Sequence, residues 1–560
     1  MNVSHPVPIT TRLQQAASMA GRGIRFIGDA DARLVTWGEL HDDARVVAAS
    51  LQARGIVPGD HVAILGPTSR GLVTAIQGCW LAGAASMVLP LPMRMGSLEE
   101  FINSTRLRIH HGDARLLLID DLLAAFYEAH PDDPPIEPLG SLLPGSPTAA
   151  AGFNALIPDP DPERLVILQY TSGSTSEPKG VMIPDRVLGA NLDAIVEATG
   201  LTPGPDVGVS WLPLYHDMGL VGLLGTTMTS GVDLVLAAPT DFLGHPGKWM
   251  QWISDYRGTC TAGPNFSWVL AARALRRMDG LDLSSMRIAL SGAEPVDPDT
   301  VESFLDAARR HGFPDGGVFP AFGMAEVAIA GTFPPPGRGM LCDPIDPYVL
   351  EHDKIAVPAD PSLDTTRRMV VLGRAVPGLE IRICDPQTGE VLADRHVGEL
   401  EISGTSVTPG YYKRPELNDT LFHDGWLRTG DLGYLLDGEL VLCGRIKDVI
   451  IIGGRNVYPQ DIERAVNEVD GVRPGNVIAF GVAGYKAKES VVVVAETKSA
   501  ADELDVLRKQ IHHVVLDAVG VPPRDVMLIR AGTMAKTSSG KLQRALCREQ
   551  YLADELLLAE

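Results

Sequence analysis

The chain has 560 residues, of which 45% are hydrophobic and 21% are charged, a composition typical of a large globular protein with several compact units. Its 48 basic and 70 acidic residues give a net charge of -22, which argues against DNA, RNA or an anionic lipid surface as a main partner. Small anionic ligands stay open, because a local site can be positive on an acidic protein.

The cysteines and the N-terminal residues indicate the cellular location of the protein. The six cysteines are scattered and form no C-x-x-C pair, so we expect neither a zinc site nor a disulfide framework, and a reducing, cytoplasmic location fits. The stretch MNVSHPVPITTRLQQAA lacks a basic segment followed by an apolar core, so we expect no signal peptide. No apolar run reaches the roughly 18 residues of a spanning helix, so we expect no membrane span.

Apolar runs of strand length alternate with helical patterns through most of the chain. The run HVAILG (61–66) precedes the helical pattern RGLVTAIQGCWLAG (70–83), and residues 298–312 predict an amphipathic helix that begins after an aspartate and ends at a glycine. Further buried strands are predicted at RLLLID (115–120), DLVLAA (233–238) and RIALSG (287–292). The alternation predicts an α/β fold of stacked layers with largely parallel sheets. The Pro- and Gly-rich residues 131–162 predict a surface connection.

The pattern changes in the last third of the chain. The short strands GLEIRICD, GELEISG and GELVLCG are separated by turn residues, which predicts a small β-rich subdomain over about 375–446. The following residues alternate between strands such as SVVVVAET and helices such as YPQDIERAVNEV, which predicts a compact α+β unit. We therefore predict a large N-terminal domain over 1–446 and a small C-terminal domain over 447–560.

The stretch QYTSGSTSEPKGVMI (169–183) places six small residues and one lysine between two apolar runs. Small residues let backbone N–H groups approach an anion, and hydroxyls and a lysine add donors and charge, as in a phosphate cradle. The common nucleotide-loop pattern does not fit, because Pro178 and Gly180 flank Lys179. SSGKL (538–542) fails in the same way, because Leu542 replaces the hydroxyl that would bind magnesium. On composition alone, a solvated hairpin loop is an equal alternative.

A resemblance separates these alternatives. YTSGSTSEPKGV resembles the phosphate loop of the adenylate-forming superfamily, which includes acyl-CoA synthetases, nonribosomal adenylation domains and luciferase. Further motifs follow in the same order as in that family and span nearly the whole chain. They are SGAEP (291–295), AFGMAE (321–326), GYYKRPE (410–416), WLRTGDLG (426–433), GRIKDVIIIGGRNVYPQDIE (444–463) and KTSSGKLQR (536–544).

The resemblance implies that the chain activates a carboxylic acid with ATP and Mg²⁺. Attack of the carboxylate on the α-phosphate yields an acyl-adenylate and pyrophosphate, and the negative charge that gathers there must be neutralised. Lys541 is the expected catalytic cation, and Glu326 and Thr175 are the expected magnesium ligands. Asp431 is expected to accept hydrogen bonds from the ribose hydroxyls. Without the motifs, Lys541 would be interpreted as an exposed surface lysine and Asp431 as an aspartate that caps a turn.

The same resemblance implies further nucleotide contacts and a hinge. Phe322 stands where relatives more often have a tyrosine, and it is expected to stack on adenine. Lys447 is expected to be the hinge about which the C-terminal domain rotates between adenylation and acyl transfer, with a solvated loop charge as the alternative. The residues expected to bind the nucleotide are Thr171, Ser172, Gly173, Ser174, Thr175, Lys179, Gly292, Ala293, Glu294, Ala321, Phe322, Gly323, Met324, Asp431 and Arg445. Ser176 replaces a frequent glycine of the loop, and its effect is left open.

Two stretches indicate a branch of the family. WLPLYHDMGLVG (211–222) and AGPNFSWVLAARAL (262–275) resemble fatty-acyl-AMP ligases. His216, also a candidate catalytic residue, and Asp217 would lie near the acyl carboxylate, with Gly263 and Met324 as further substrate contacts. The alternative for the His-Asp pair is a capped loop–helix junction.

One long segment bears on which molecule accepts the acyl group. The 47 positions from Glu326 to Gly373 resemble the insertion of the fatty-acyl-AMP ligases, which is thought to restrain domain rotation and disfavour CoA. A carrier-protein phosphopantetheine is then the expected acceptor, usually in a polyketide or similar pathway. An acyl-CoA ligase and a member that binds nucleotide without adenylating stay open. A long-chain fatty acid is the default substrate, and a cyclic or terpenoid acid is compatible.

Overall fold

The parallel strands predicted from the apolar runs form two large sheets at the centre of the N-terminal region. The structure is a computed structural model that describes residues 6–28, 32–92, 98–150, 155–170, 178–363, 365–452, 455–483, 489–537 and 541–559. The first sheet has the order β13-β12-β11-β9-β10-β1-β2 and the second β6-β5-β3-β4-β7-β8. Only the β1–β2 pair and the β7–β8 pair are antiparallel among these neighbours.

The strands of the first sheet are β1 (Gly23–Phe26), β2 (Leu34–Thr36), β9 (Val207–Ser210), β10 (Asp233–Leu236), β11 (Cys260–Gly263), β12 (Ile288–Ser291) and β13 (Val318–Pro320). Those of the second are β3 (His61–Leu65), β4 (Ala85–Val88), β5 (Ala114–Ile119), β6 (Ile136–Pro138), β7 (Leu165–Tyr170) and β8 (Gly180–Pro184). Every residue of β3 is buried, as expected for a strand covered on both faces. The predicted surface connection 131–162 differs in one respect, because it contains β6, the edge of the second sheet.

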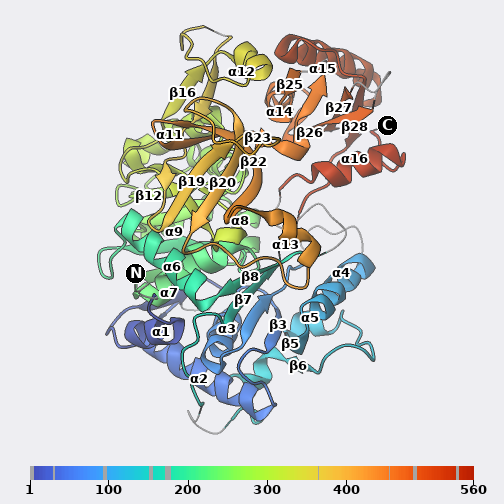
Figure 1. Cartoon of the computed structure of the whole chain (residues 1–560). Helices are drawn as coiled ribbons and strands as arrows, with labels where there is room; N and C mark the ends of the chain where they lie inside the picture. The colour runs from blue at the N-terminus through green and yellow to red at the C-terminus, as the bar shows by residue number, and fades with distance from the viewer. Residues whose placement is uncertain are drawn as a thin grey trace.

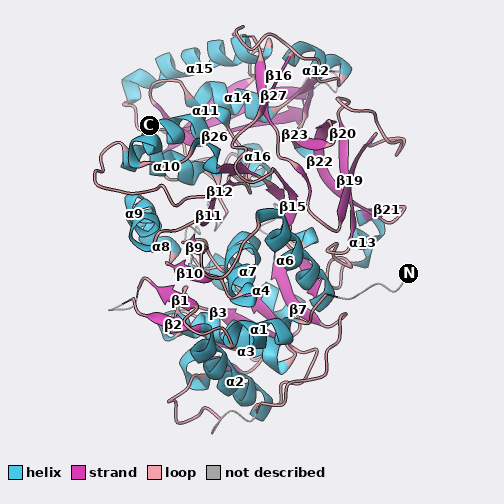
Figure 2. Cartoon of the chain, turned by 90° about the vertical axis from the view of Figure 1, so that its left-hand side faces the viewer, coloured by secondary structure: helices cyan, strands magenta, loops and turns pink. Residues whose placement is uncertain are grey.

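Helices form layers between and outside the two sheets. Helix α6 contacts β7 and β8 of the second sheet, and α7 contacts β10 of the first. Figure 2 shows α6 and α7 between the large sheets, with α9 and α10 on the outer side. The helices of this region are α1 (Ile9–Ala17), α2 (Trp37–Ala53), α3 (Arg70–Ala82), α4 (Leu98–His111), α5 (Asp121–Ala124), α6 (Asp185–Thr199), the π-helix η2 (Met218–Gly225), α7 (Thr226–Ser230), α8 (Pro239–Gly244), α9 (Gly247–Tyr256), α10 (Asn265–Leu275) and α11 (Pro298–Ala308).

Helix α11 illustrates how the sequence sets its bounds. The side chain of Asp297 accepts a hydrogen bond from the backbone N–H of Thr300 over 3.0 Å, and Pro298 occupies the first turn. Val301 and Phe304 lie on the buried face at helical spacing. The chain then leaves the helix through one 3₁₀ turn that ends at Gly312, whose φ of 80° suits a residue without a side chain.

An antiparallel region follows, as the turn-rich sequence predicted. Its main sheet has the order β19-β20-β22-β21, with β23 paired to β22. Its elements are β19 (Leu379–Cys384), β20 (Gly398–Gly404), α13 (Pro415–Leu421), β21 (Phe422–His423), β22 (Trp426–Leu436) and β23 (Glu439–Arg445). Before it come β14 (Phe322–Gly323), the 3₁₀ turn η5 (Ala325–Val327), β15 (Ala330–Phe333), β16 (Cys342–Ile345), α12 (Pro347–Asp353), β17 (Arg367–Val370) and β18 (Arg374–Ala375).

The C-terminal region packs helices on both faces of one sheet, β26-β27-β28. Val491 and Val493 of β27 pack with α14 and α15, whereas Val492 and Val494 pack with Cys547 of α16. This alternation explains the unbroken run of valines. The elements are η6 (Ile446–Asp448), β24 (Ile450–Ile452), β25 (Arg455–Val457), α14 (Pro459–Asn467), β26 (Val472–Ala483), β27 (Glu489–Thr497), α15 (Leu504–Val519), β28 (Asp525–Arg530) and α16 (Arg544–Leu552).

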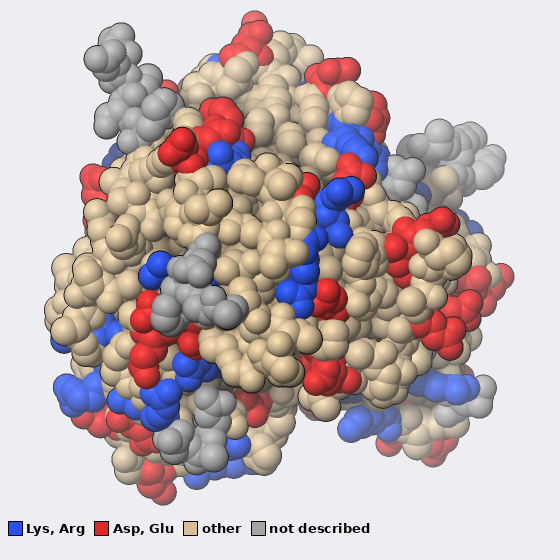
Figure 3. All heavy atoms as spheres, turned by 90° about the horizontal axis from the view of Figure 1, so that it is seen from below, with Lys and Arg blue, Asp and Glu red and all other residues tan. Residues whose placement is uncertain are grey.

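The regions assemble into one mixed α/β architecture, which confirms the predicted fold class. Figure 1 shows the blue N-terminal sheet at the bottom and the orange-to-red C-terminal region at the upper right, beside α12. On the face seen in Figure 3, basic and acidic side chains of the described residues lie interspersed with uncharged ones. Within the described residues, no helix is both long and apolar enough to cross a membrane.

Candidate active site

A cleft of about 2440 Å³ collects most of the residues that the sequence singled out. Its lining includes residues at the carboxyl ends of β7, β11 and β12, the usual ligand position in parallel α/β sheets. It also includes residues from the β-rich region and from the C-terminal region. The predicted residues that line it are Lys179, His216, Asp217, Gly292, Ala293, Glu294, Ala321, Phe322, Gly323, Met324, Glu326, Asp431, Arg445, Lys447 and Lys541.

Two groups of predicted residues are not among that lining. Thr171, Ser172, Gly173, Ser174 and Thr175 lie outside the described residues, as does Ser176. Gly263 ends β11, and a Cβ atom there would lie 2.4 Å from Oγ of Ser267 and 2.9 Å from the Trp249 ring. The glycine is therefore required by packing beneath the cleft.

Lys541 reaches the cleft from a short hairpin of the C-terminal region. Thr537 holds this hairpin, because its N–H donates to the Lys541 carbonyl over 2.8 Å and its Oγ1 accepts from the Lys541 N–H over 3.1 Å. Burial lowers the pKa of the Lys541 ammonium, and the carboxylates of Asp217 and Glu294 oppose that shift. Two acidic side chains of the N-terminal region thus lie close to this C-terminal lysine.

Glu326 is held by a tyrosine to which the sequence analysis assigned no role. The phenol of Tyr411 donates a hydrogen bond to Oε1 of Glu326 over 2.6 Å, and the Glu326 side chain is buried. Burial raises the pKa of Glu326, and the bond from Tyr411 opposes that shift. The Lys179 ammonium lies 5.6 Å from the centre of the Tyr411 ring, a cation–π distance. Tyr411 therefore joins the lysine of the phosphate-loop motif to Glu326.

The carboxylate of Glu326 suits a metal held mainly by phosphates. Within the described residues, no cluster of three or more His, Cys, Asp or Glu side chains could hold a metal by itself. Mg²⁺ usually keeps several waters and is bound through one or two carboxylates plus substrate phosphates. A single buried carboxylate facing a cleft with Lys179 fits that manner of binding.

Asp431 and Arg445 form an ion pair at the joint between the β-rich and C-terminal regions. Nε of Arg445 donates to Oδ1 of Asp431 over 2.8 Å, and only 5% of Asp431 is exposed. Burial raises the pKa of Asp431, and Arg445 opposes that shift. Burial, together with the nearby Arg445, lowers the pKa of Lys447. The predicted hinge thus lies beside the predicted ribose contact.

Close backbone packing forms the wall at Phe322. A Cβ atom on Gly292 would lie 3.0 Å from the carbonyl oxygen of Ala321, and one on Gly323 would lie 2.0 Å from that of Ile329. Ala293 has a φ of 66°, a left-handed conformation that non-glycine residues rarely adopt. Strained residues of this kind concentrate at ligand sites.

His216 and Asp217 are neighbouring residues that both line the cleft. Nδ1 of His216 lies 2.6 Å from Oδ1 of Asp217, which also accepts from the N–H of Met218 over 2.8 Å. Burial would raise the pKa of Asp217, but His216 and Lys541 lower it overall. Met218 begins the π-helix η2, a form of helix that is frequent at functional sites. Apolar side chains line the cleft beyond the pair, among them Trp211, Leu243, Phe266 and Leu270.

The segment between Phe333 and Arg368 packs partly on the body of the protein. Ile345 and Leu350 are fully buried in a cluster that includes Tyr458 of the C-terminal region, whereas Tyr348 is exposed. Nε of Arg455 donates to Glu351 of α12 over 2.5 Å.

A second ion pair joins the strand that ends this segment to α14. Nη1 of Arg367, on β17, lies 2.7 Å from Oδ2 of Asp461, and the guanidinium also lies 5.2 Å from the Tyr458 ring centre. Both charged side chains are nearly buried, at 8% and 12% exposure. The segment therefore contacts the C-terminal region through charges as well as apolar groups.

Comparisons with known proteins find matches over most of the chain. Residues 13–412 match the model of the AMP-binding enzyme family, and residues 447–560 match that of the AMP domain of disco-interacting protein 2-like proteins. A Mycobacterium tuberculosis protein named as a ligase, Rv1013, is 39% identical over 91% of this chain and 93% of its own. The medium-chain-fatty-acid–[acyl-carrier-protein] ligase JamA of Moorena producens is 33% identical over 94% of this chain and 92% of its own. A solved structure from work on fatty acyl-adenylate ligases of E. coli and L. pneumophila has a TM-score of 0.89 and 31% identity over 98% of both chains.

Proposed function

The chain belongs to the family of AMP-binding enzymes, and we propose that it joins a fatty acid to AMP and passes the acyl group to a carrier-protein phosphopantetheine. The cleft that brings Lys541, Glu326 and Asp431 together carries the proposal. A member that binds nucleotide without adenylating would be expected to lack one of these three side chains. Free thiols on all six cysteines support a cytoplasmic location.

The proposed first step is the attack of a carboxylate oxygen on the α-phosphorus of ATP. The bond from that phosphorus to the bridging oxygen breaks, and pyrophosphate leaves with the electron pair. Lys541 neutralises the charge that develops at the α-phosphate in a site with little water. Its position between the two regions means that adenylation requires the domain arrangement described here.

The other residues bind and orient the reactants. Asp431 accepts hydrogen bonds from ribose hydroxyls, and Phe322 offers a ring face to adenine. Glu326 would hold Mg²⁺ together with Thr175, and the ion would neutralise phosphate charge when bound. The apolar walls beyond His216 exclude water from the acyl chain and accept its hydrocarbon, which supports a fatty acid as substrate.

The acceptor part of the proposal rests on the contacts of the Phe333–Arg368 segment. Acyl transfer in this family uses a second domain arrangement, so contacts made in only one arrangement bias the equilibrium between the two. The Arg367–Asp461 pair would have to break if the C-terminal region rotates, and each separated charge would need new solvation. This bias disfavours repeated acylation of the CoA thiol, and the thiol of a carrier arm is then the proposed acceptor, which takes the acyl group while AMP leaves.

The test is a pyrophosphate-exchange screen over carboxylic acids, followed by mass spectrometry of the products made with CoA and with holo carrier protein. We expect exchange with fatty acids and acyl transfer to the carrier. No exchange with any acid would contradict the adenylation proposal. Efficient acyl-CoA formation by the intact protein would instead make the chain an acyl-CoA ligase with an unusual insertion.

A further inference from the structure

Asp431 sits on a bulge of β22 whose shape depends on a buried glutamate of the neighbouring strand. In the β20–β22 ladder Glu399 pairs with Leu432 and Glu401 with Arg428, so Leu400 alone faces three residues of β22. These three residues are Thr429, Gly430 and Asp431. Such bulges aim side chains near functional sites and need local support to keep their shape.

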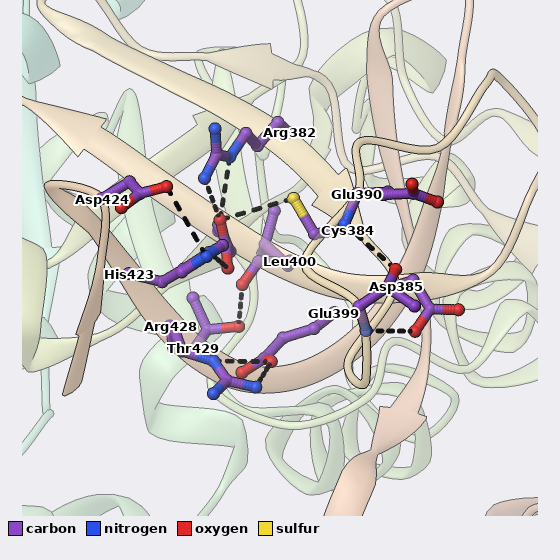
Figure 4. Close-up of polar contacts among 12 residues, drawn as sticks. Arg382, Cys384, Asp385, Glu390, Glu399, Leu400, His423, Asp424, Arg428 and Thr429 are labelled. Carbon is purple, nitrogen blue, oxygen red and sulfur yellow. Dashed lines mark hydrogen bonds and ion pairs between the residues drawn. The ribbon is translucent and has the colours of Figure 1, made fainter. Parts of the chain in front are cut away.

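Glu399 supplies two contacts to this bulge. Its Oε1 accepts from the backbone N–H of Gly430 over 3.1 Å, and its Oε2 accepts from Nε of Arg428 over 2.9 Å. Glu399 is only 3% exposed, so both bonds form in a site of low polarity where they are strong. Figure 4 shows the contact between Arg428 of β22 and Glu399 of β20. Gly430 has a φ of 70°, so the bulge uses a backbone conformation that suits glycine.

Thr429 continues the connection to Asp431. Its Oγ1 donates to the carbonyl of Leu400 over 2.8 Å and accepts from the N–H of Asp431 over 3.1 Å. Hydrogen bonds therefore connect the backbone around Gly430 to β20. These hydrogen bonds set the direction of the Asp431 side chain.

We infer that Glu399 is a positioning residue for the nucleotide, acting through the Arg428–Asp431 bulge. The inference rests on the proposed ribose contact of Asp431. It gives Glu399 a role in the adenylation reaction although Glu399 is not among the residues that line the cleft.

The neighbouring Glu401 offers a matched control. It lies two residues along the same strand, on the same face, and is 2% exposed. Nε and Nη2 of Arg382 donate to it over 2.8 and 2.6 Å, and His423 lies on its other oxygen. It thus matches Glu399 in burial and in having an arginine partner, but within the described residues its side chain bonds to Arg382, Cys384 and His423 and not to residues 429–431.

The test compares Glu399→Gln with Glu401→Gln in the full-length protein. AMP and 2′,3′-dideoxy-AMP binding are measured by calorimetry, and the ATP KM by pyrophosphate exchange. We expect Glu399→Gln to weaken AMP binding and raise the ATP KM about fivefold, the scale of one net hydrogen bond. Its affinity for the dideoxy nucleotide should change less. We expect Glu401→Gln to lose about as much thermal stability as Glu399→Gln, while its AMP binding and its ATP KM stay normal.

Other outcomes overturn the inference. Equal nucleotide effects in both glutamine variants would assign Glu399 a general structural role, and normal AMP binding in Glu399→Gln would exclude any positioning role. If Glu399→Gln does not fold, Thr429→Val is measured instead, because this change removes the side-chain hydrogen bonds that Thr429 makes to Leu400 and Asp431. An unchanged ATP KM in Thr429→Val would then overturn the inference. A normal ATP KM in Asp431→Ala overturns both the ribose contact and this inference, whereas wild-type protein without exchange activity contradicts the proposed function itself.

Discussion

The guanidinium of Arg544 lies 2.7 Å from the carboxylate of Asp448, the residue that follows the proposed hinge Lys447. The same guanidinium donates to Glu463 of α14 over 2.7 Å. Since Arg544 comes three residues after Lys541, it connects the hairpin of the proposed catalytic lysine to the hinge side of the C-terminal region. The lysine and the residues after the hinge should therefore move together.

Arg544→Ala tests this tie through stability. The change leaves Asp448 and Glu463 without their buried partner, and breaking a buried pair in this way costs about 3–5 kcal/mol. Thermal unfolding of the C-terminal region should occur at a clearly lower temperature. Arg548→Ala is the control, because exposed Arg548 lies one turn later on α16 and donates to the Gly481 carbonyl. Equal effects of the two variants would contradict the special role of Arg544.

Lys541→Ala should reduce acyl-AMP formation by about 10² or more, the scale of losing one preorganised charge partner. ATP binding and transfer of supplied acyl-AMP should change much less, because other residues bind the nucleotide. Lys536→Ala, in the same hairpin, should retain most activity. Pyrophosphate exchange provides the measurement, and a near-normal rate in Lys541→Ala would show that another group neutralises the α-phosphate.

The pH profile of adenylation should report Lys541. Burial lowers the pKa of its ammonium below the ordinary 10.5, so the charge is lost at a lower pH than in an exposed lysine. Since the reaction needs the charged form, kcat/KM for ATP should fall as the pH rises through this lowered pKa. Lys541→Arg should be slower but keep its charge, and its profile should lack that alkaline decline. An identical decline in both proteins would assign it to another group.

Glu326→Gln should raise the magnesium concentration needed for adenylation, because the amide is a weaker ligand than a carboxylate. Tyr411→Phe removes only the hydroxyl that donates to Glu326 and keeps the ring beside Lys179, so it should shift the magnesium titration in the same direction by less. The initial rate is followed while magnesium is varied at saturating ATP. An unchanged titration in Glu326→Gln would make that residue structural.

The double change Arg367→Met and Asp461→Leu should raise the ratio of acyl-CoA to acyl-AMP. It removes both charges of the pair together, so neither is left buried alone. A loss of about 1.4 kcal/mol from one domain arrangement would shift the populations tenfold. Mass spectrometry of reactions with CoA measures the ratio.

Arg368→Ala controls for general damage to β17. Arg368 is the next residue and pairs with Asp299 and Glu302 of α11, within the N-terminal region. The control should leave the product ratio unchanged. If the double change also leaves it unchanged, the Arg367–Asp461 pair does not govern the acceptor.

The sequence by itself determined the fold class, and most of the site residues that it indicated line the cleft. Apolar runs without alternation indicated strands buried on both faces, and β3 and β27 have this environment. Short motifs identified Lys541, Glu326 and Asp431 as candidates, because nucleotide chemistry needs specific groups within a few consecutive residues. Short motifs of this kind can be recognised in the sequence alone, because their residues are close together in the chain.

Only the tertiary structure decided which distant residues support those candidates. Tyr411 lies 85 positions from Glu326, and Arg367 lies far from Asp461 in the chain. Glu399 is separated from Gly430 by 31 positions and meets it only because β20 and β22 pair with a bulge. No local pattern marks such contacts, since they depend on strand register and on how two regions pack. The motifs therefore indicated the chemistry, and the packing of separate segments set the geometry in which it can occur.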